Sequence, residues 1–381
     1  MKPKLIILTL IFIVFITIVG CSSDSRTHPG SKTITNSYRF DLVNWEIKAI
    51  SSEIWQSITI HESPDSSDIV VAYFNSVQSG KTTIDDGTSL TKLRPRVEKI
   101  IQQQIRKVIS DLGINNPSNN IMGIHFPPFS FILDKPPELL VTSSRNKIEI
   151  LKEVRLRPDL TIAEMESIES EAEKMGESAV VLRLGGIGTF PAFVNNDATL
   201  SEALNDAAHE WMHQYLAFKP LGFRYVLDLL GISPNYDIVT INETVAGIFG
   251  DELEALVYDK YYSTFQTQLA NPPSSDAPVF DFNATMRNIR LTVDVLLKQG
   301  LIDQAEQYME SQRQFLQTKG YNIRKLNQAY FAFNGAYGSA PTSVNPIGIK
   351  IKEIRNEYAS IKGFLDVISS VTDLHQLNAL K

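Results

Sequence analysis

The chain has 381 residues, of which 43% are hydrophobic and 21% are charged, and its formal net charge is −7. This length and composition predict one large domain or two smaller ones and exclude a chain that is mostly disordered or of low complexity. Because the acidic balance is spread along the chain without a basic stripe, we expect no nucleic-acid partner.

The first 21 residues predict export and a lipid anchor. Lys2 and Lys4 precede an apolar run over residues 5–20, which is shorter than the ~20 residues that cross a bilayer comfortably. The run ends in Ile18-Val19-Gly20-Cys21, which resembles a bacterial lipobox, a signal that is cut before the cysteine and lipidated there. We expect an extracytoplasmic protein, anchored to the membrane through Cys21 on the periplasmic or cell-surface side. An uncleaved anchor helix is the alternative.

Cys21 is the only cysteine, so an intrachain disulfide and a thiol nucleophile elsewhere are both excluded. Residues 22–37 are rich in Ser, Thr, Gly and Pro and predict a flexible tether. The expected organisation is a signal peptide over 1–20, a tether over 21–38, an α/β part over 39–218 and a helical part over 219–381.

The α/β part begins with predicted helices over 40–60 and 90–112, and we assign no structure to the polar segment between them. Strands are expected over 129–133, 139–142 and 147–156, with Pro136-Pro137 making the turn between the first two. A helix over 161–175 follows, in which Thr161 and Glu164 have the spacing of a capping box. Residues 178–184 predict a buried strand.

Residues 185–194 contain several glycines and Pro191, which favour an edge strand or an irregular extended segment. The rest of the chain predicts helices over 200–217, 225–230, 238–262, 286–299, 304–319, 323–333, 349–359 and 363–370. The predicted fold class is therefore α+β, with a small N-terminal mixed sheet and a mainly helical C-terminal half. We expect the hairpin over 286–319 to pack over the helices that carry the site described next.

The helix over 200–217 contains a pattern that favours metal binding. His209 and His213 lie four residues apart, so their imidazoles share one helix face and converge on a single zinc ion at Zn–N distances of ~2.0–2.1 Å. Glu210 lies at the edge of that face, where its carboxylate reaches an attacking water without binding the metal. This is the HExxH arrangement. The alternative is a pair of histidines that is satisfied within the core.

A catalytic zinc needs a third protein ligand and one open position. The metzincin pattern requires a histidine six residues after His213, but Lys219 occupies that position. Glu243 follows Asn242 at the start of the predicted helix over 238–262, and it is the candidate for the third ligand. Glu252 and Glu254 remain alternatives, in which case Glu243 would be a solvated helix residue.

Residues 208–216 and 242–246 together resemble the gluzincin peptidases, the group that includes thermolysin and the zinc aminopeptidases. The chain is also similar to bacterial lipoproteins of the aminopeptidase type, and that likeness extends to residues 327–333. The resemblance rests on these short motifs. It implies a zincin-like core, a Zn²⁺ cofactor held by His209, His213 and Glu243, and Glu210 as the general base that hydrolyses a peptide or protein substrate.

The sequence departs from the gluzincin pattern in two places. His213 and Glu243 are separated by 30 positions, which is longer than in thermolysin-like enzymes and requires an extra loop or helix over 222–230. Many gluzincins carry an acidic residue four positions after the ligand glutamate, where it orients a ligand histidine, and Gly247 stands here instead. We therefore expect Asp251 or Glu252 to make that contact.

Two further segments are candidates for the site. Residues 185–194 precede the motif helix and are expected to pair with the substrate backbone, or else to form an ordinary loop. Four polar side chains share one helical face of the segment after residue 323. We nominate one of them, Tyr330, as the donor of a hydrogen bond to the oxyanion. The alternative is that the four side chains form a structural hydrogen-bond network. The four residues are Asn327, Tyr330, Asn334 and Tyr337.

The predicted function is therefore a zinc-dependent peptidase that acts outside the cytoplasm. Two other functions remain open. One is a non-catalytic zinc-fold lipoprotein that serves as a binding or envelope-assembly module, although a structural zinc site has no need of Glu210. The other is an amidase that acts on cell-wall peptides.

Overall fold

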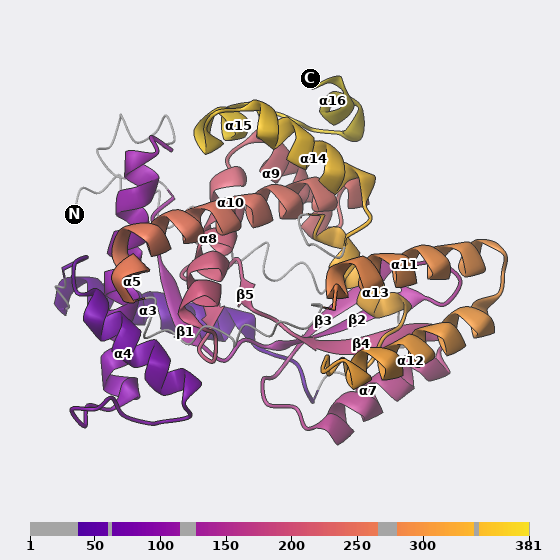
Figure 1. The fold of residues 1–381 in the computed structure, drawn as a ribbon, viewed down its shortest axis with the longest axis horizontal. Helices are drawn as coiled ribbons and strands as arrows, with labels where there is room; N and C mark the ends of the chain where they lie inside the picture. Colours follow the sequence, from indigo (N-terminus) through magenta and orange to yellow (C-terminus); the bar gives the residue numbers. More distant parts are fainter. Residues whose placement is uncertain (1–36, 60–62, 115–126, 266–279, 339–342, 381) are drawn as a thin grey trace.

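The computed structural model describes residues 37–59, 63–114, 127–265, 280–338 and 343–380 (Figure 1). The predicted signal peptide, Cys21 and most of the tether lie outside the described residues. The described chain is a mixed α and β fold, as the sequence predicted, but its strands form two small sheets where a single mixed sheet was expected. None of its described helices combines the length and hydrophobicity that a bilayer crossing requires.

Within the described residues, three helices precede the sheets: α3 (Leu42–Thr59), α4 (Ser67–Gln78) and α5 (Leu90–Asp111). Helix α4 corrects the expectation for the polar segment between the first two predicted helices. Its Val70, Val71 and Phe74 are buried in the main core. The apolar stretch of α4 is short and flanked by serines and aspartates, so the segment as a whole looks hydrophilic although one face of it packs inside.

The first sheet has the order β1-β6-β5, from β1 (Phe131–Asp134), β6 (Ala192–Asn195) and β5 (Gly186–Ile187). Strand β1 runs parallel to β6, and β5 runs antiparallel to it. The second sheet is antiparallel with the order β3-β2-β4, from β3 (Ile150–Leu156), β2 (Glu138–Ser144) and β4 (Glu177–Arg183).

The turn expected at Pro136-Pro137 does not join paired strands, because β1 and β2 belong to different sheets. Proline has no backbone N–H to donate to a ladder, so the chain leaves the first sheet at this point and enters the second. The segment over 185–194, expected as an edge strand or an irregular extended segment, is only partly so: β5 is an edge strand, but residues 192–194 belong to β6, the central strand of the sheet. Pro191 lies just before β6, so its missing N–H removes no bond from the ladder.

Helix α5 covers the outer edge of β1 through three side chains spaced four residues apart. Glu98 accepts a hydrogen bond from the Leu133 N–H at 2.8 Å, and the Gln102 amide donates to the Phe131 carbonyl at 3.0 Å. The Arg106 guanidinium donates to the carbonyl just before the strand. Since α5 occupies one edge, the free edge of this sheet is the one formed by β5.

Helix α7 (Ile162–Lys174) lies on one face of the second sheet, and its capping box of Thr161 and Glu164 confirms the sequence prediction. Val154 and Leu156 of β3 face α7, whereas Val141 of β2 faces Ala329 of α13 (Gln328–Ala336) on the opposite side. Helix α13 begins later than predicted. The second sheet is therefore sandwiched between α7 and α13 (Figure 1).

The remaining helices are α8 (Leu200–Leu216), α9 (Pro220–Leu229), α10 (Tyr236–Tyr262), α11 (Phe282–Lys298), α12 (Ile302–Thr318), α14 (Pro346–Glu357), α15 (Ile361–Ile368) and α16 (Leu374–Ala379), with a 3-10 turn at Ser263–Phe265. Helix α9 starts earlier than predicted because Pro220 suits a first helical turn, and α16 was not predicted. One core joins α5, α8, α10, α14 and α15, so it contains residues on both sides of position 218.

The hairpin of α11 and α12 corrects another expectation. Its buried Met286, Val293 and Met309 share a core with Leu326 and Phe331, around the start of α13, and among the described residues that core includes none from α8 or α10. Figure 1 shows the hairpin beside α13 and the second sheet, away from α8. The hairpin therefore supports α13 and does not cover the motif helix.

Candidate metal centre

Helices α8 and α10 place three candidate ligands against one another. The Nε2 atoms of His209 and His213 lie 3.1 Å apart. The Oε2 atom of Glu243 lies 3.3 Å from Nε2 of His209 and 3.4 Å from Nε2 of His213. The three side chains therefore form a possible metal-binding group, and they are the three that the sequence nominated.

The spacing of these atoms fits a tetrahedral ion. Bonds of ~2.0–2.1 Å to zinc place neighbouring ligand atoms of a tetrahedron roughly 3.3–3.4 Å apart. The Oε2 atom of Glu243 is buried and has no hydrogen-bond partner among the described residues. A buried carboxylate oxygen without a donor is costly, and a bound cation supplies the missing partner. Two imidazole nitrogens and one carboxylate oxygen are a donor set that zinc accepts.

Close packing of the two helices fixes this geometry. A Cβ atom at Gly250 would lie 3.0 Å from Oδ1 and 3.2 Å from the backbone oxygen of Asn205, so the missing side chain at this position favours the close approach of α10 to α8. Capping holds the helices at their ends. Thr199 and Glu202 form a capping box on α8, and the Asn235 side chain accepts from the Ile238 N–H on α10.

Asn242 orients the second histidine. Its Oδ1 lies 2.6 Å from Nδ1 of His213, which therefore donates a proton there and leaves the lone pair of Nε2 for a metal. Asp251 and Glu252, which were expected in this role, lie elsewhere: Asp251 accepts from Asn205, and Glu252 pairs with a guanidinium of α14. Eight or nine residues of helix carry them more than ~10 Å along the axis from Glu243.

The other candidates for the third ligand are also engaged away from the histidines. Glu252 is held by Arg355 at 2.6 Å, and Glu254 accepts from the Ser201 hydroxyl at 2.6 Å. Glu243, by contrast, is only 6% exposed and faces both imidazoles. The alternative that makes Glu243 a solvated residue is therefore wrong.

Burial and charge oppose each other at the ligands. Burial raises the pKa of the Glu243 carboxyl, but the imidazoles beside it outweigh burial and hold that pKa well below its usual range. Burial lowers the pKa of His213, but the charge of Glu243 outweighs it and raises the pKa to about 9. At neutral pH the metal-free site is thus a coupled cation and anion, and a metal that binds displaces the proton of His213.

Glu210 lies next to the ligands without joining them. It is buried, and burial raises its pKa, while the two imidazoles act in the opposite direction. Strand β5 passes directly over it: a Cβ atom at Gly186 would lie 2.9 Å from Oε1 of Glu210, and one at Gly188 would lie 3.2 Å from Oε2. The glycines of this segment therefore leave room for the carboxylate between β5 and α8.

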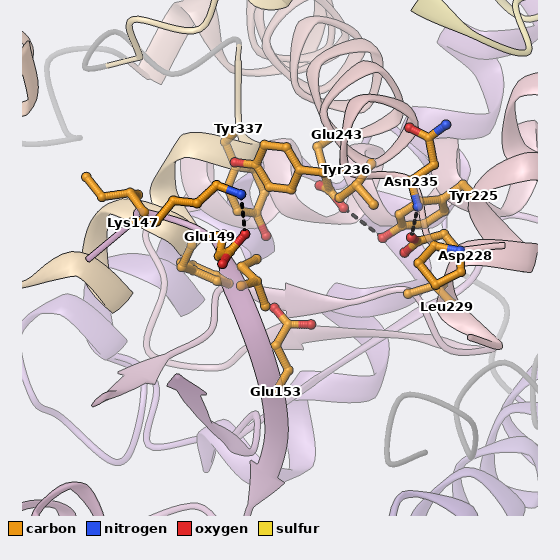
Figure 2. A pocket seen from close by; sticks show the side chains of 15 residues that line it. Lys147, Glu149, Glu153, Tyr225, Asp228, Leu229, Asn235, Tyr236, Glu243 and Tyr337 are labelled. Atoms are coloured by element: carbon orange, nitrogen blue, oxygen red, sulfur yellow. Dashed lines mark hydrogen bonds and ion pairs between the residues drawn. The ribbon is translucent and has the colours of Figure 1, made fainter. Parts of the chain in front are cut away.

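Tyr225 of α9 is a site residue that the sequence did not reveal. Its hydroxyl donates to Oε1 of Glu243 at 2.8 Å (Figure 2). Its ring stacks on His213 with centroids 5.5 Å apart. The only available signal was the long spacing between His213 and Glu243, which required an inserted helix. That helix carries Tyr225 into the site.

Tyr330, the nominated oxyanion donor, lines a different cavity beside Arg290 and Tyr236. Tyr337 lines the metal cavity instead, with its ring 6.2 Å from that of His209. Both belong to the predicted polar face, but Tyr337 is the residue that ends α13 and leaves the helical backbone there, so its side chain turns toward α8.

The two asparagines of that face have structural roles. Asn327 caps α13 by accepting from the Tyr330 N–H at 2.9 Å and donates to the Ala179 carbonyl at 2.8 Å. Asn334 donates to the Tyr330 carbonyl. The hydrogen-bond-network alternative therefore holds for both asparagines, while Tyr337 alone of the four faces the candidate ligands.

The ligands open into a cavity of about 190 Å³, which also contains Glu210. A second cavity of about 380 Å³ adjoins it and shares Glu243 and Tyr225 among its lining residues (Figure 2). Comparisons with protein-family models, with curated proteins and with solved structures found no match for this chain.

Proposed function

We propose that this chain is a zinc-dependent peptidase with a gluzincin-like core. One observation carries the proposal. Three ligand atoms lie 3.1–3.4 Å from one another, and a fourth residue, Glu210, holds its carboxylate in the same cavity outside the ligand set. Three protein ligands with a carboxylate beside an open position are typical of a hydrolytic zinc site rather than a structural one.

Zinc, when bound, supplies a Lewis acid that activates water and polarises a carbonyl group. Glu210 accepts the proton of the attacking water and delivers it to the leaving amine, and the rise in its pKa caused by burial suits both transfers. Asn242 and Tyr225 hold the ligands: one fixes the tautomer of His213, and the other donates to Glu243.

Tyr337 replaces Tyr330 as the proposed oxyanion donor, because its side chain lines the cavity that contains Glu210 and His209.

Strand β5 supports the proposal as a place where a substrate backbone can pair. It is the edge of its sheet that α5 does not cover, and it lies against Glu210, so an extended peptide that pairs with it would pass over the general base.

We infer the location from the first 21 residues, which predict an exported protein held at the membrane by a lipid on Cys21. The substrate would then be a peptide or protein outside the cytoplasm. Replacing Cys21 with serine should move the protein from the membrane fraction to the soluble fraction, as immunoblotting of fractionated cells would show. An unchanged distribution would favour the uncleaved anchor helix.

Metal content tests the site first. We would express the chain without its first 21 residues and measure zinc by elemental analysis in the wild type, His213→Ala, Glu243→Gln and the control Glu254→Gln. We expect about one zinc per chain in the wild type and the control, and a strong loss in the other two. A folded wild type that takes up no zinc would contradict the proposal.

Activity tests the chemistry. A peptide library should be cleaved by the zinc-loaded wild type, while Glu210→Gln keeps its zinc and loses activity by several orders of magnitude. Zinc binding without cleavage that depends on Glu210 would support the binding-module function instead. Cleavage of cell-wall fragments but not of free peptides would favour the amidase.

A further inference from the structure

The metal cavity and the larger cavity beside it share one wall. The residues that line both are Glu153, Tyr225, Leu229, Glu243, Phe333 and Tyr337. Two of them are charged: Glu243, the ligand whose Oε2 atom is buried without a hydrogen-bond partner, and Glu153. Figure 2 shows them on opposite sides of the larger cavity, Glu153 on β3 and Glu243 on α10. A substrate that reaches from one cavity into the other therefore passes Glu153.

The two cavities differ in character. Outside the ligand group and the shared wall, most of the side chains that line the metal cavity are aliphatic, Leu42, Leu139, Leu184, Ile187 and Val226 among them. Arg155, Thr189, Gln214 and the carboxylate of Glu210 line it as well. The larger cavity is acidic: among the described residues that line it, Lys147 is the only basic one, and it pairs with Glu149 at 2.6 Å. Glu153 and Asp228 add two further carboxylates, and Asp228 accepts the Asn235 N–H.

The alternation of β3 places Glu153 on the metal side of the sheet. Val154 and Leu156 are buried against α7, so Glu153 and Arg155 project from the opposite face. Glu153 lines both cavities together with Glu243, which places it close to the ligands.

We infer that Glu153 binds a cationic group of the substrate, an ammonium or a guanidinium, next to the scissile bond, while an aliphatic side chain of the substrate fills the metal cavity. This inference rests on the proposed peptidase function and names its substrate class. The substrate is a peptide with an apolar residue beside either a basic residue or a free amino terminus. A cation there gains a charge-assisted hydrogen bond in a partly desolvated site.

Binding tests this inference separately from catalysis. The full chain carrying Glu210→Gln is purified in detergent, loaded with zinc and titrated calorimetrically with peptides that place leucine next to lysine or next to norleucine, its uncharged analogue. Each peptide is used with a free and with an acetylated amino terminus. The same titrations are made after adding Glu153→Gln, Glu153→Lys, or the control Glu177→Gln, a carboxylate at the start of β4 that lines neither cavity.

We expect the cationic peptide to bind at least about tenfold more tightly than its uncharged analogue, which is the ratio that one charge-assisted hydrogen bond gives. The ratio should approach one in Glu153→Gln and stay unchanged in Glu177→Gln. Glu153→Lys should reverse it in favour of a peptide with glutamate in place of lysine. A preference for lysine over norleucine shows that the cation is a side chain. A preference for the free over the acetylated peptides, with lysine and norleucine bound equally, shows that it is the terminal amine.

Equal binding of all four peptides would overturn the inference, as would a preference that survives Glu153→Gln in a folded, zinc-loaded protein. Tightest binding of an acidic peptide by the unmodified site would also overturn it and assign selection to Arg155. Cleavage of the same peptides by the wild type is measured separately from binding. No cleavage would contradict the proposed function, whereas a binding ratio that depends on Glu153 would stand.

Discussion

At the scale of single residues, the site depends on side chains that touch the ligands. Asn242 fixes the proton of His213 on Nδ1, and Tyr225 donates to the carboxylate oxygen of Glu243 that faces away from the imidazoles. Without these contacts the imidazole and the carboxylate would rotate among several positions. Metal binding would then have to order both side chains, and the metal affinity would be lower.

Replacing Asn242 with alanine should therefore weaken zinc binding by about 10–100-fold, because the histidine loses the acceptor that sets its tautomer and orientation. Competition with a chelator of known affinity measures the change. Asn205→Ala is the matched control, since Asn205 makes a comparable side-chain bond to Asp251 between the same two helices. Equal zinc affinity in both variants would show that Asn242 has no orienting role.

The two tyrosines of α13 give a second prediction at this scale. Tyr337→Phe removes the hydroxyl that we assign to the oxyanion and should lower kcat by about 100-fold with little change in KM. Tyr330→Phe removes the same group from the other cavity and should leave both parameters unchanged. If Tyr330→Phe proves to be the slower enzyme, the original nomination is correct.

At the scale of elements, two helices and one short strand form the site. Helix α8 supplies both histidines and Glu210, helix α10 supplies Glu243 and Asn242, and β5 covers Glu210. The strand has only two residues, and it approaches α8 because Gly186 has no side chain. The sequence predicted an edge strand or a loop over residues 185–194. This holds for β5 and the turn after it, whereas residues 192–194 form part of the central strand β6.

Gly186→Ala tests the strand. The added Cβ would lie 2.8 Å from the backbone oxygen of Phe193 and 2.9 Å from Cγ of Glu210, so either β5 or the general base must move. We expect kcat/KM to fall by at least about tenfold and the free energy of unfolding to fall by about 1–3 kcal/mol. Gly363→Ala, whose nearest neighbours would be 3.4 Å away, is the control for adding a methyl group. Unchanged kinetics would remove β5 from the site.

At the scale of the whole molecule, the first helix of the described chain holds the segment that leads into β6 through a hydrogen bond and an aromatic contact. Glu46 of α3 is 1% exposed and accepts a hydrogen bond from the Phe190 N–H at 3.2 Å. Trp45 beside it stacks on Phe193 with centroids 4.1 Å apart. Residues near the start of the described chain thus fix a segment about 145 positions later, on which the position of β5 depends.

Glu46 also predicts how stability depends on pH. Burial raises the pKa of its carboxyl to about 7, against the opposing hydrogen bond from Phe190. Ionisation is therefore unfavourable in the folded state, so the contribution of Glu46 to stability is complete below pH 4.5 and is lost as the pH rises through 7.

Glu46→Gln keeps the hydrogen-bond acceptor and removes the titration. Relative to the wild type, the variant should gain about 1–3 kcal/mol in the free energy of unfolding between pH 4.5 and pH 8. Urea unfolding at both pH values measures this difference. Parallel pH profiles for the two proteins would mean that Glu46 ionises as easily in the folded chain as in the unfolded one.

The sequence alone determined what depends on neighbours a few positions apart. The capping box of Thr161 and Glu164 follows from a spacing of three, and the convergence of His209 and His213 follows from a spacing of four. The Asn-Glu pair identified Glu243 before any distance was known. Most of the helices were placed for the same reason, since their apolar period is visible within the segment itself.

Only the tertiary structure decided which distant segments meet. Strand β1 pairs with β6 and not with β2, the polar contact of His213 comes from Asn242, and Tyr337 reaches the ligands where Tyr330 does not. In the sequence nothing distinguishes Glu153 from other strand residues, and only the two cavities show that it lies beside the ligands. Such contacts depend on how whole elements pack, and a residue's own neighbours in the sequence carry no information about that packing.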